Sequence, residues 1–466
     1  MQIHFGIKKI TKKFSIFKNG IRSMQIYRSE TTNDPQIDGL EQFTQKNISS
    51  GEKNSLFAWG FSATGALGNE NLLKLRKEDP PFPRKVIKRF PRRMKFFNPK
   101  FTIYDGAAGN GFTVIAATYR NSSHTLFGCG LNTDSQIGFQ SNRSNEPLVC
   151  VANLVPIDLP LEESNVVSKH RPTQERVVKV ACGRAHTICL TSHDNVFTMG
   201  NNSFGQCARP IVENEKYFGS KKISKIDYDH SDPIVQIECG LDHSLFLTAS
   251  GVVYSCGLGC DGQLGNGSFK ISPILTKVQG DILGEKIISI SSAADCVLAL
   301  NDKGQIFGWG NSEYGQLASA TDNAQVNVSR QLFAKNQQDF FVNVAASGSM
   351  CALSNRAGRV CVWGYGFLGL GPNVKHLRKP TELSPILFGS NDFKQTKIIK
   401  LFAGLNQFGA INDLGELFMW GVNNRGNLGI GSVSDISYPH RVPIAESVLK
   451  LSLGLDHSIA ITKKLM

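Results

Sequence analysis

A short apolar strand that ends in glycine recurs seven times along this chain of 466 residues. The seven glycines are Gly60, Gly130, Gly200, Gly257, Gly310, Gly364 and Gly421. They are 70, 70, 57, 53, 54 and 57 residues apart, and each of the four tryptophans directly precedes one of them. A repeated unit of this kind buries its apolar face only against its neighbours. We therefore expect one array of seven similar units, although length alone favours about three domains.

Two further elements recur at fixed distances from these glycines. A tight turn of the type Gly-Gln-Leu-Gly follows the strand, as at 262–265, 315–318 and 426–429. A histidine segment precedes the strand, and both His186 and His243 lie 14 residues before the glycine of their unit. The same position in other units holds Phe112, Cys296, Met350 and Gln407. Each unit thus contains several short strands with glycine turns, which predicts a four-stranded antiparallel sheet.

Seven such sheets predict an all-β fold, a seven-bladed β-propeller, because radial packing of the blades protects most strand edges. The two ends of the sequence indicate how the ring closes. The last histidine segment, around His457, stops before its strand–glycine element, whereas the first such element, at 56–60, lacks a preceding segment. Pairing of these N- and C-terminal strands completes the seventh blade. The predicted propeller spans residues 51–466.

The first thirty residues have a different pattern. Residues 1–29 contain seven Lys and Arg side chains and no acidic one. Apolar residues recur there at spacings of 4, 3, 4, 3 and 4, from Ile3 through Ile21, which places them on one face of a helix. A basic amphipathic helix without acids is typical of a mitochondrial transit peptide. We predict a transit peptide at 1–30 and a linker at 31–50; a solvated basic tail or a nuclear signal is the alternative.

A second basic segment, residues 72–100, interrupts the first repeat. It has 11 basic and 2 acidic residues, a charge of +9. Residues 1–29 carry +7, so the rest of the chain carries 13 − 7 − 9 = −3 of the net charge of +13. Phenylalanines at 82, 90, 96 and 97 and five prolines accompany the charges, which predicts an extended loop. Lys and Arg neutralise phosphates and phenylalanine stacks on bases, so the loop is a candidate RNA site; an acidic protein, a cardiolipin-rich membrane or solvent are alternatives. The candidate binding residues are Lys74, Arg76, Lys77, Arg84, Lys85, Lys88, Arg89, Arg92, Arg93 and Lys95.

Several functional classes find no support in the sequence. No apolar run is long enough for a transmembrane helix. The 11 cysteines lack paired Cys-x-x-Cys spacing, so we expect small buried side chains rather than disulfides or a zinc site. Adjacent residues of a strand point to opposite faces, so Asp242-His243 and Asp456-His457 are not expected to form catalytic pairs. We predict a protein that acts by binding, without a catalytic centre, metal or cofactor.

The repeats resemble those of the regulator-of-chromosome-condensation family, in which seven such units form a propeller. The resemblance covers about residues 51–466. Three stretches are closer still to the mitochondrial, G-exchanging-factor-like branch of that family: Met199 to Cys207, Trp309 to Asp322 and Trp363 to Gly366.

Similarity to this branch implies two activities. The first is guanine-nucleotide exchange on the mitochondrial dynamin-like GTPase of inner-membrane fusion. The alternative is a matrix scaffold for large-subunit ribosomal RNA, beside pseudouridine synthases, in the assembly of the mitochondrial ribosome. The expected location is the mitochondrial matrix, with peripheral contact to the inner membrane as a further expectation.

Overall fold

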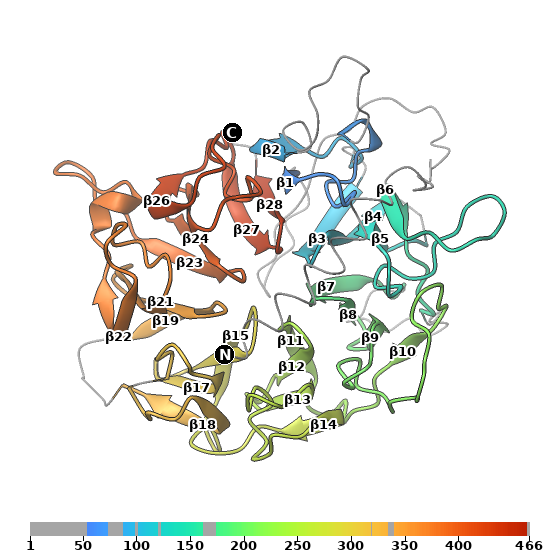
Figure 1. Cartoon of the computed structure of the whole chain (residues 1–466), viewed down its shortest axis with the longest axis horizontal. Helices are drawn as coiled ribbons and strands as arrows, with labels where there is room; N and C mark the ends of the chain where they lie inside the picture. Colours follow the sequence, from blue (N-terminus) through green and yellow to red (C-terminus); the bar gives the residue numbers. More distant parts are fainter. Residues whose placement is uncertain are drawn as a thin grey trace.

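The computed structural model describes residues 54–72, 87–97, 101–119, 123–161, 174–317, 319–333 and 340–463. Within these residues, seven four-stranded antiparallel sheets surround a common axis (Figure 1). Each sheet is one blade, and its strands follow one another from the axis outward. The predicted seven-bladed all-β propeller is thereby confirmed. The predicted transit peptide, 1–30, and linker, 31–50, lie outside the described residues.

Blade 1 combines strands from both ends of the chain. From the axis outward it contains β27 (Ser447–Leu453), β28 (His457–Lys463), β1 (Asn54–Phe61) and β2 (Ile87–Arg93). Strand β1 runs antiparallel to β28, with Asn54 opposite Lys463 and Gly60 opposite His457. This pairing is the ring closure that the two incomplete repeats predict.

Blades 2 to 7 are each formed by four consecutive strands. Blade 2 contains β3 (Phe101–Ala108), β4 (Phe112–Tyr119), β5 (Leu126–Leu131) and β6 (Cys150–Pro156). Blade 3 contains β7 (Val177–Cys182), β8 (His186–Thr191), β9 (Val196–Gly200) and β10 (Ile223–Lys225). Blade 4 contains β11 (Ile234–Cys239), β12 (His243–Thr248), β13 (Val253–Gly257) and β14 (Ser272–Lys277).

The remaining blades follow the same order. Blade 5 contains β15 (Ile287–Ser291), β16 (Cys296–Asn301), β17 (Ile306–Asn311) and β18 (Gln325–Leu332). Blade 6 contains β19 (Phe341–Ala346), β20 (Met350–Asn355), β21 (Val360–Tyr365) and β22 (His376–Glu382). Blade 7 contains β23 (Ile398–Ala403), β24 (Gln407–Asn412), β25 (Leu417–Gly421) and β26 (Ile436–Arg441). Two short 3-10 helices, η2 (Glu70–Leu72) and η4 (Pro385–Phe388), lie in connections.

The hydrophobic core lies between neighbouring blades, and the repeated tryptophan links them. One core cluster, for example, joins Leu298 and Leu300 of blade 5 to Leu353 and Trp363 of blade 6. The indole N–H of Trp363 donates to the carbonyl oxygen of Gln316, in the glycine turn of blade 5, at 2.7 Å. Equivalent bonds join Trp309 to Gln263 at 3.0 Å and Trp59 to Asn427 at 2.8 Å. Three of the four tryptophans at this position therefore connect their own blade to the glycine turn of the preceding one.

The histidines of the repeat are buried, and their rings link neighbouring blades. The Nε2 atom of His457, in blade 1, lies 2.7 Å from Oγ1 of Thr113 in blade 2. That of His186 lies 3.1 Å from Oγ of Ser244, in the next blade. The glycine three residues earlier accommodates the ring, because a Cβ on Gly183 would lie 2.2 Å from Cε1 of His186. Such an approach is closer than van der Waals contact permits, so the spacing of glycine and histidine is dictated by packing.

The premise that the adjacent Asp and His side chains point apart fails at one of the two pairs. Asp456 and His457 do contact each other, with Oδ1 and Nδ1 2.9 Å apart. Asp456 precedes the first residue of β28, so strand alternation does not separate the two side chains. Asp242, by contrast, pairs with Arg184 rather than with its neighbour His243. Both ring nitrogens of His457 are thus engaged, Nε2 with blade 2 and Nδ1 within blade 1.

Candidate functional site: the basic outer strand and the central channel

The basic segment is partly a strand. Residues 87–93 form β2, the outermost strand of blade 1, which pairs with β1 instead of forming the predicted loop. An outermost strand has one unpaired edge, where Pro91 is tolerated. Lys88, Arg89, Arg92, Arg93 and Lys95 lie in the described part. The other five candidates, Lys74, Arg76, Lys77, Arg84 and Lys85, lie outside the described residues.

The five described cations have two different roles. The side chain of Arg93 pairs with Glu446 and lies over the ring of Phe57, with 5.6 Å from its Cζ to the ring centroid. Glu446 also accepts a hydrogen bond from Thr462 of β28 at 2.5 Å. Arg93 therefore belongs to the closure of the ring. Arg89, Arg92 and Lys95 are exposed and can meet a phosphate-bearing partner, and Lys88 is partly exposed beside them.

Only one of the described phenylalanines in this segment faces solvent. Phe90 is 55% exposed on β2. Phe97 is 3% exposed and makes edge contacts with Phe101 and Phe127, at 5.3 and 6.2 Å between centroids. Phe96 packs against the same cluster. The expectation that Phe97 stacks on bases is therefore wrong, because blade 2 needs this ring to fill its outer core; Phe96 is partly buried beside it.

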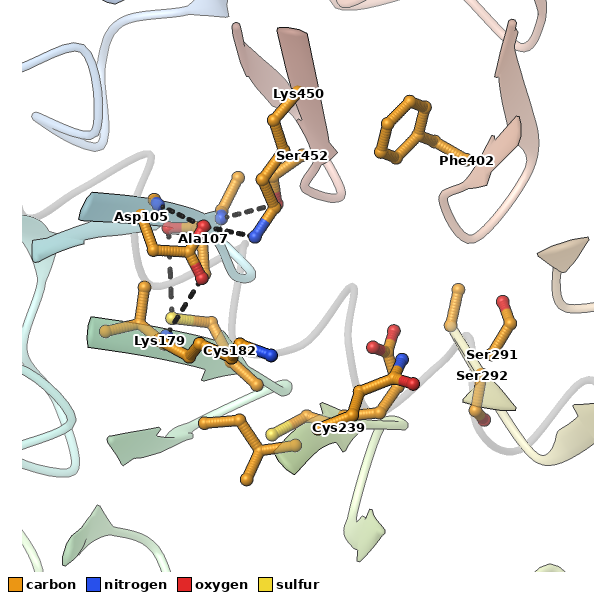
Figure 2. A pocket seen from close by; sticks show the side chains of 18 of the residues that line it. Asp105, Ala107, Lys179, Cys182, Cys239, Ser291, Ser292, Phe402, Lys450 and Ser452 are labelled. Carbon is orange, nitrogen blue, oxygen red and sulfur yellow. Dashed lines mark hydrogen bonds and ion pairs between the residues drawn. The ribbon is translucent and has the colours of Figure 1, made fainter. Parts of the chain in front are cut away.

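The central channel is lined by a position that all seven blades share, which the sequence analysis missed. Each innermost strand carries a bulge at the same place in its pairing with the second strand. The residues that follow the bulge are Asp105, Lys179, Gln236, Ser289, Asn343, Lys400 and Lys450. We call these seven the channel ring. All of them line a cavity of about 1120 Å³ on the propeller axis. Figure 2 labels three of them, Asp105, Lys179 and Lys450.

Five of the seven side chains of the channel ring bind the next blade. Lys450, on blade 1, pairs with Asp105 on blade 2, and Asp105 accepts the backbone N–H of Val180 on blade 3 at 3.1 Å. Gln236 makes two hydrogen bonds to the backbone of Ile290, at 2.8 and 3.1 Å. Together with the bonds from Lys179 and Lys400, these contacts form a polar belt around part of the axis. The belt escaped sequence analysis because its members share a position in the fold and no residue type.

The channel wall also holds groups with shifted pKa values. Burial lowers the pKa of Lys179, an effect that nearby Asp105 opposes. Burial also lowers the pKa of Lys400, and the charge of Lys450 lowers it further. Burial raises the pKa of Glu238, on β11, well above its usual range, so this carboxyl binds a proton more readily than one in water. The channel wall that holds the three lysines therefore carries less negative charge, because the Glu238 carboxyl is more readily protonated.

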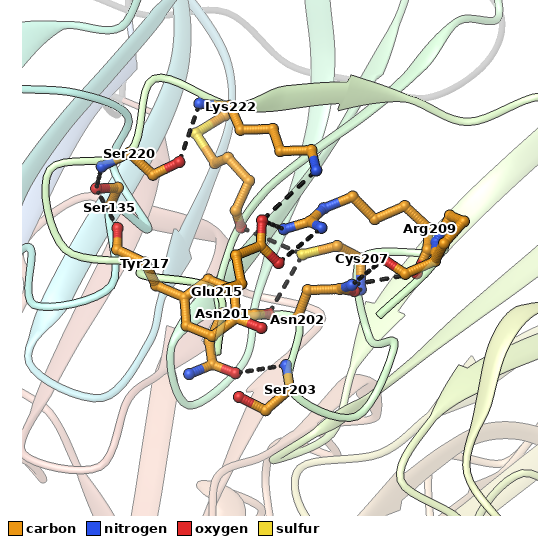
Figure 3. A network of polar contacts seen from close by, with 12 residues as sticks. Ser135, Asn201, Asn202, Ser203, Cys207, Arg209, Glu215, Tyr217, Ser220 and Lys222 are labelled. Atoms are coloured by element: carbon orange, nitrogen blue, oxygen red, sulfur yellow. Dashed lines mark hydrogen bonds and ion pairs between the residues drawn. The ribbon is translucent and has the colours of Figure 1, made fainter. Parts of the chain in front are cut away.

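A rigid polar network orders the long connection between β9 and β10. Arg209 makes a two-pronged contact with Glu215, with Nη1–Oε2 and Nη2–Oε1 distances of 2.9 and 2.8 Å (Figure 3). Burial alone raises the pKa of Glu215, but hydrogen bonds and charge from Arg209 and Lys222 bring it below its ordinary value. Ser135, in the corresponding connection of blade 2, donates to the carbonyl of Tyr217 at 2.8 Å. The network ties together residues 201–222, here named the blade 3 loop.

Three further expectations concern membrane spans, metal sites and cysteines in the described part of the chain. No helix there is both long and apolar enough to cross a membrane. No three His, Cys, Asp or Glu side chains within it are grouped as a metal ion requires. None of the 11 cysteines forms a disulfide; eight are buried, Cys182 and Cys361 are half-buried, and Cys260 is exposed. The expectation that all of them are buried is therefore wrong at Cys260, which lies in the connection from β13 to β14.

Known proteins resemble this chain along nearly its whole ring. A family model described as the RCC1-like domain matches residues 55–460. The human RCC1-like G exchanging factor-like protein is 41% identical over 419 residues, which cover 88% of this chain and 86% of that protein. The mouse protein of the same name is 40% identical, over 88% of this chain and 87% of its own length.

Solved structures agree with these relatives. The crystal structure of human WBSCR16 superimposes with a TM-score of 0.79 at 40% identity, covering 89% of this chain and 100% of that one. Prp20p from Saccharomyces cerevisiae superimposes with a TM-score of 0.67 at 20% identity over 90% of this chain and 93% of its own, which shows a common fold. Since the family model spans almost all of the described ring and a near-full-length relative is 41% identical, this chain belongs to the RCC1-like domain family.

Proposed function

We propose that this chain is a guanine-nucleotide exchange factor that is imported into mitochondria and acts on the dynamin-like GTPase of inner-membrane fusion. The observation that carries the proposal is the 41% identity, along almost the whole propeller, to a human protein named as G exchanging factor-like. The transit-like sequence at 1–30 supports the location. Fusion of residues 1–30 to a fluorescent reporter tests import, and a diffuse cytosolic signal would contradict it.

An exchange factor works by differential binding. It binds the GTPase more tightly without nucleotide than with nucleotide, and by linkage it weakens nucleotide binding by the same factor. A rigid surface suits this task because little ordering entropy is lost on association. The blade 3 loop is such a surface, fixed by the Arg209–Glu215 contact. Val212 is 49% and Phe218 46% exposed on it, and aromatic side chains such as Phe218 are enriched in protein interfaces.

The geometry of a blade places this loop on one face of the ring. In each blade the hairpin from the second to the third strand lies at the opposite end of the third strand from the connection to the fourth. The blade 3 loop joins β9 to β10, whereas Leu414 lies in the hairpin from β24 to β25. Leu414 is 41% exposed, so it is a matched apolar control on the other face.

The exchange assay uses the full chain and the GTPase loaded with fluorescent GDP. We expect release to accelerate at least tenfold over the spontaneous rate, and Phe218→Ala to remove most of that acceleration, since an anchor residue contributes about 2 kcal/mol or more. Leu414→Ala should leave the acceleration of GDP release unchanged. A release rate equal to the spontaneous one would remove the proposal, and equal loss in both variants would remove the assignment of the face.

A second function is supported by β2. Arg89 and Arg92 are exposed there beside the exposed ring of Phe90, and Lys95 is exposed just after the strand, a combination that suits single-stranded RNA. We propose large-subunit ribosomal RNA, together with the pseudouridine synthases that act on it, as the second partner. The two functions are compatible because β2 and the blade 3 loop belong to different blades.

Binding to a labelled ribosomal RNA fragment tests this second function. We expect the variant with Arg89, Arg92 and Lys95 changed to alanine to bind more weakly and to lower the slope of log affinity against log salt by about 2, from three phosphate contacts. Arg93 is left in place because it pairs with Glu446. Unchanged affinity and slope would clear β2 of this role. Proximity labelling in mitochondria then shows whether pseudouridine synthases lie nearby.

A further inference from the structure

The channel ring has an uneven distribution of charge. Blades 4, 5 and 6 contribute the neutral side chains Gln236, Ser289 and Asn343. Three of the other four blades contribute lysines, Lys450 on blade 1, Lys179 on blade 3 and Lys400 on blade 7. Asp105 on blade 2, between two of these lysines in ring order, is the one carboxylate of the ring. One side of the channel is therefore cationic and the other is neutral and polar.

The belt does not need the charge of these lysines. Lys400 donates to the carbonyl oxygen of Leu449 at 2.7 Å, and Lys179 donates to that of Val235. Both acceptors are neutral, and Gln236 makes the same kind of link to the next blade with no charge. An ammonium group has three N–H donors, and each of these links occupies one. Lys179 and Lys400 thus bring positive charge and donor capacity beyond what holding the blades together requires.

That charge is not balanced within the channel wall. Asp105, whose side chain is 6% exposed, is already paired with Lys450 and bound by the N–H of Val180. The other carboxyls of the wall are Glu238, whose pKa burial raises, and Asp194, which lies in the hairpin between β8 and β9 rather than on an innermost strand. The charge of Lys450 lowers the pKa of both Lys179 and Lys400, so the three ammonium groups share one field. An anion among them would relieve this repulsion.

From the ring geometry, the lysine positions and the cavity of about 1120 Å³, we propose that the central channel binds a small, multiply charged phosphate anion. Its phosphate oxygens contact the ammonium groups of Lys179, Lys400 and Lys450, and its remaining atoms face the neutral side of the ring. The cavity is large enough for a nucleotide as well as for an inorganic phosphate chain. This site is separate from the exchange face and from β2.

Calorimetry with inorganic triphosphate, using the full chain at constant ionic strength, tests the proposal. The variant with Lys179 and Lys400 changed to glutamine keeps the link to the next blade, as Gln236 shows, and removes both charges. We expect it to bind triphosphate about a hundredfold more weakly, about tenfold for each lysine. Lys303→Gln, which removes an exposed lysine paired with Glu285 outside the channel, leaves the affinity unchanged.

A second pair of variants keeps the test decisive should the double variant fold poorly. Ser289 lies in the channel ring on the neutral side. Ser289→Lys should tighten triphosphate binding, and Ser289→Asp should weaken it. Parallel titrations with GTP and GDP distinguish the sources: affinity equal to that of triphosphate indicates the phosphate chain alone, and tighter binding indicates a nucleotide. Absence of triphosphate binding by the native chain, or equal binding by the lysine double variant, would overturn the proposal whatever the exchange assay gives.

Discussion

Two fully buried histidines make the stability of the ring sensitive to acid. Burial, with smaller effects from His243 and Arg184, lowers the pKa of His186 from 6.5 to about 3; burial does the same for His243. Both side chains are 0% exposed. The folded state therefore favours the neutral imidazole, while the unfolded chain takes up a proton near pH 6.5. Their contribution to stability is present above pH 6.5 and is lost as the pH falls from 6.5 towards 3.

The magnitude follows from the two pKa values. Between pH 7.5 and pH 5.0, each histidine should lower the free energy of unfolding by about 2 kcal/mol, because pH 5.0 is about 1.5 units below the unfolded pKa. Since pH 5.0 lies well above 3, the result depends little on the folded value. The two together amount to about 4 kcal/mol, or a fall of about 5 °C in Tm for a ring of about 400 residues.

The test replaces both histidines with glutamine, the residue that the chain itself uses at the equivalent Gln407. Gln407 is 1% exposed, and its amide donates to the carbonyl of Gly454 at 2.8 Å, so glutamine fits this position. Thermal unfolding of the native chain and of the His186→Gln/His243→Gln variant is compared at pH 7.5 and 5.0. The native chain should lose about 5 °C more than the variant. Equal losses would refute the reasoning, because all other titrating groups are common to both proteins.

Two further substitutions test the links between blades. Trp363→Phe should lower the free energy of unfolding by about 1 to 2 kcal/mol more than Trp420→Phe, because it removes the bond to the carbonyl of Gln316. The buried Trp420 Nε1 has no acceptor among the described residues, so its loss removes no such bond. Urea unfolding measures both variants, and equal losses would contradict the link. Glu446→Gln should weaken the ring closure by about 2 kcal/mol and speed hydrogen exchange in β1, while Glu382→Gln, on an exposed pair of blade 6, should not; unchanged exchange in both would contradict the closure role.

The repeat predicts most of the fold because the identities of its repeated residues are fixed by local backbone packing and by bonds between blades. Gly183 and His186 are spaced by the packing of a ring against a backbone, and Trp363 follows from a bond between blades. Such constraints recur in each unit and are visible in one sequence. The number of blades, their order and the closure by β1 and β28 follow from them.

The channel ring and β2 could not be predicted in the same way. Asp105, Lys179 and Gln236 occupy one position of the fold but share no letter, and a bulge shifts that position relative to simple strand alternation. In β2, the charged residues and the proline favour a loop prediction, although the segment is the strand that completes blade 1. The role of Phe97 depends on the neighbouring blade, because a buried aromatic and a base-stacking one have the same letter.

The central claim is that this propeller acts as an exchange factor through binding, and one affinity comparison tests it most directly. The full chain is titrated against the mitochondrial dynamin-like GTPase in its nucleotide-free and GDP-bound forms. Linkage predicts that the nucleotide-free form binds about a hundredfold more tightly, which is a coupling free energy of about 3 kcal/mol. Equal affinity for the two forms, or no binding to either, would contradict the claim, because a protein that does not distinguish them cannot shift nucleotide binding.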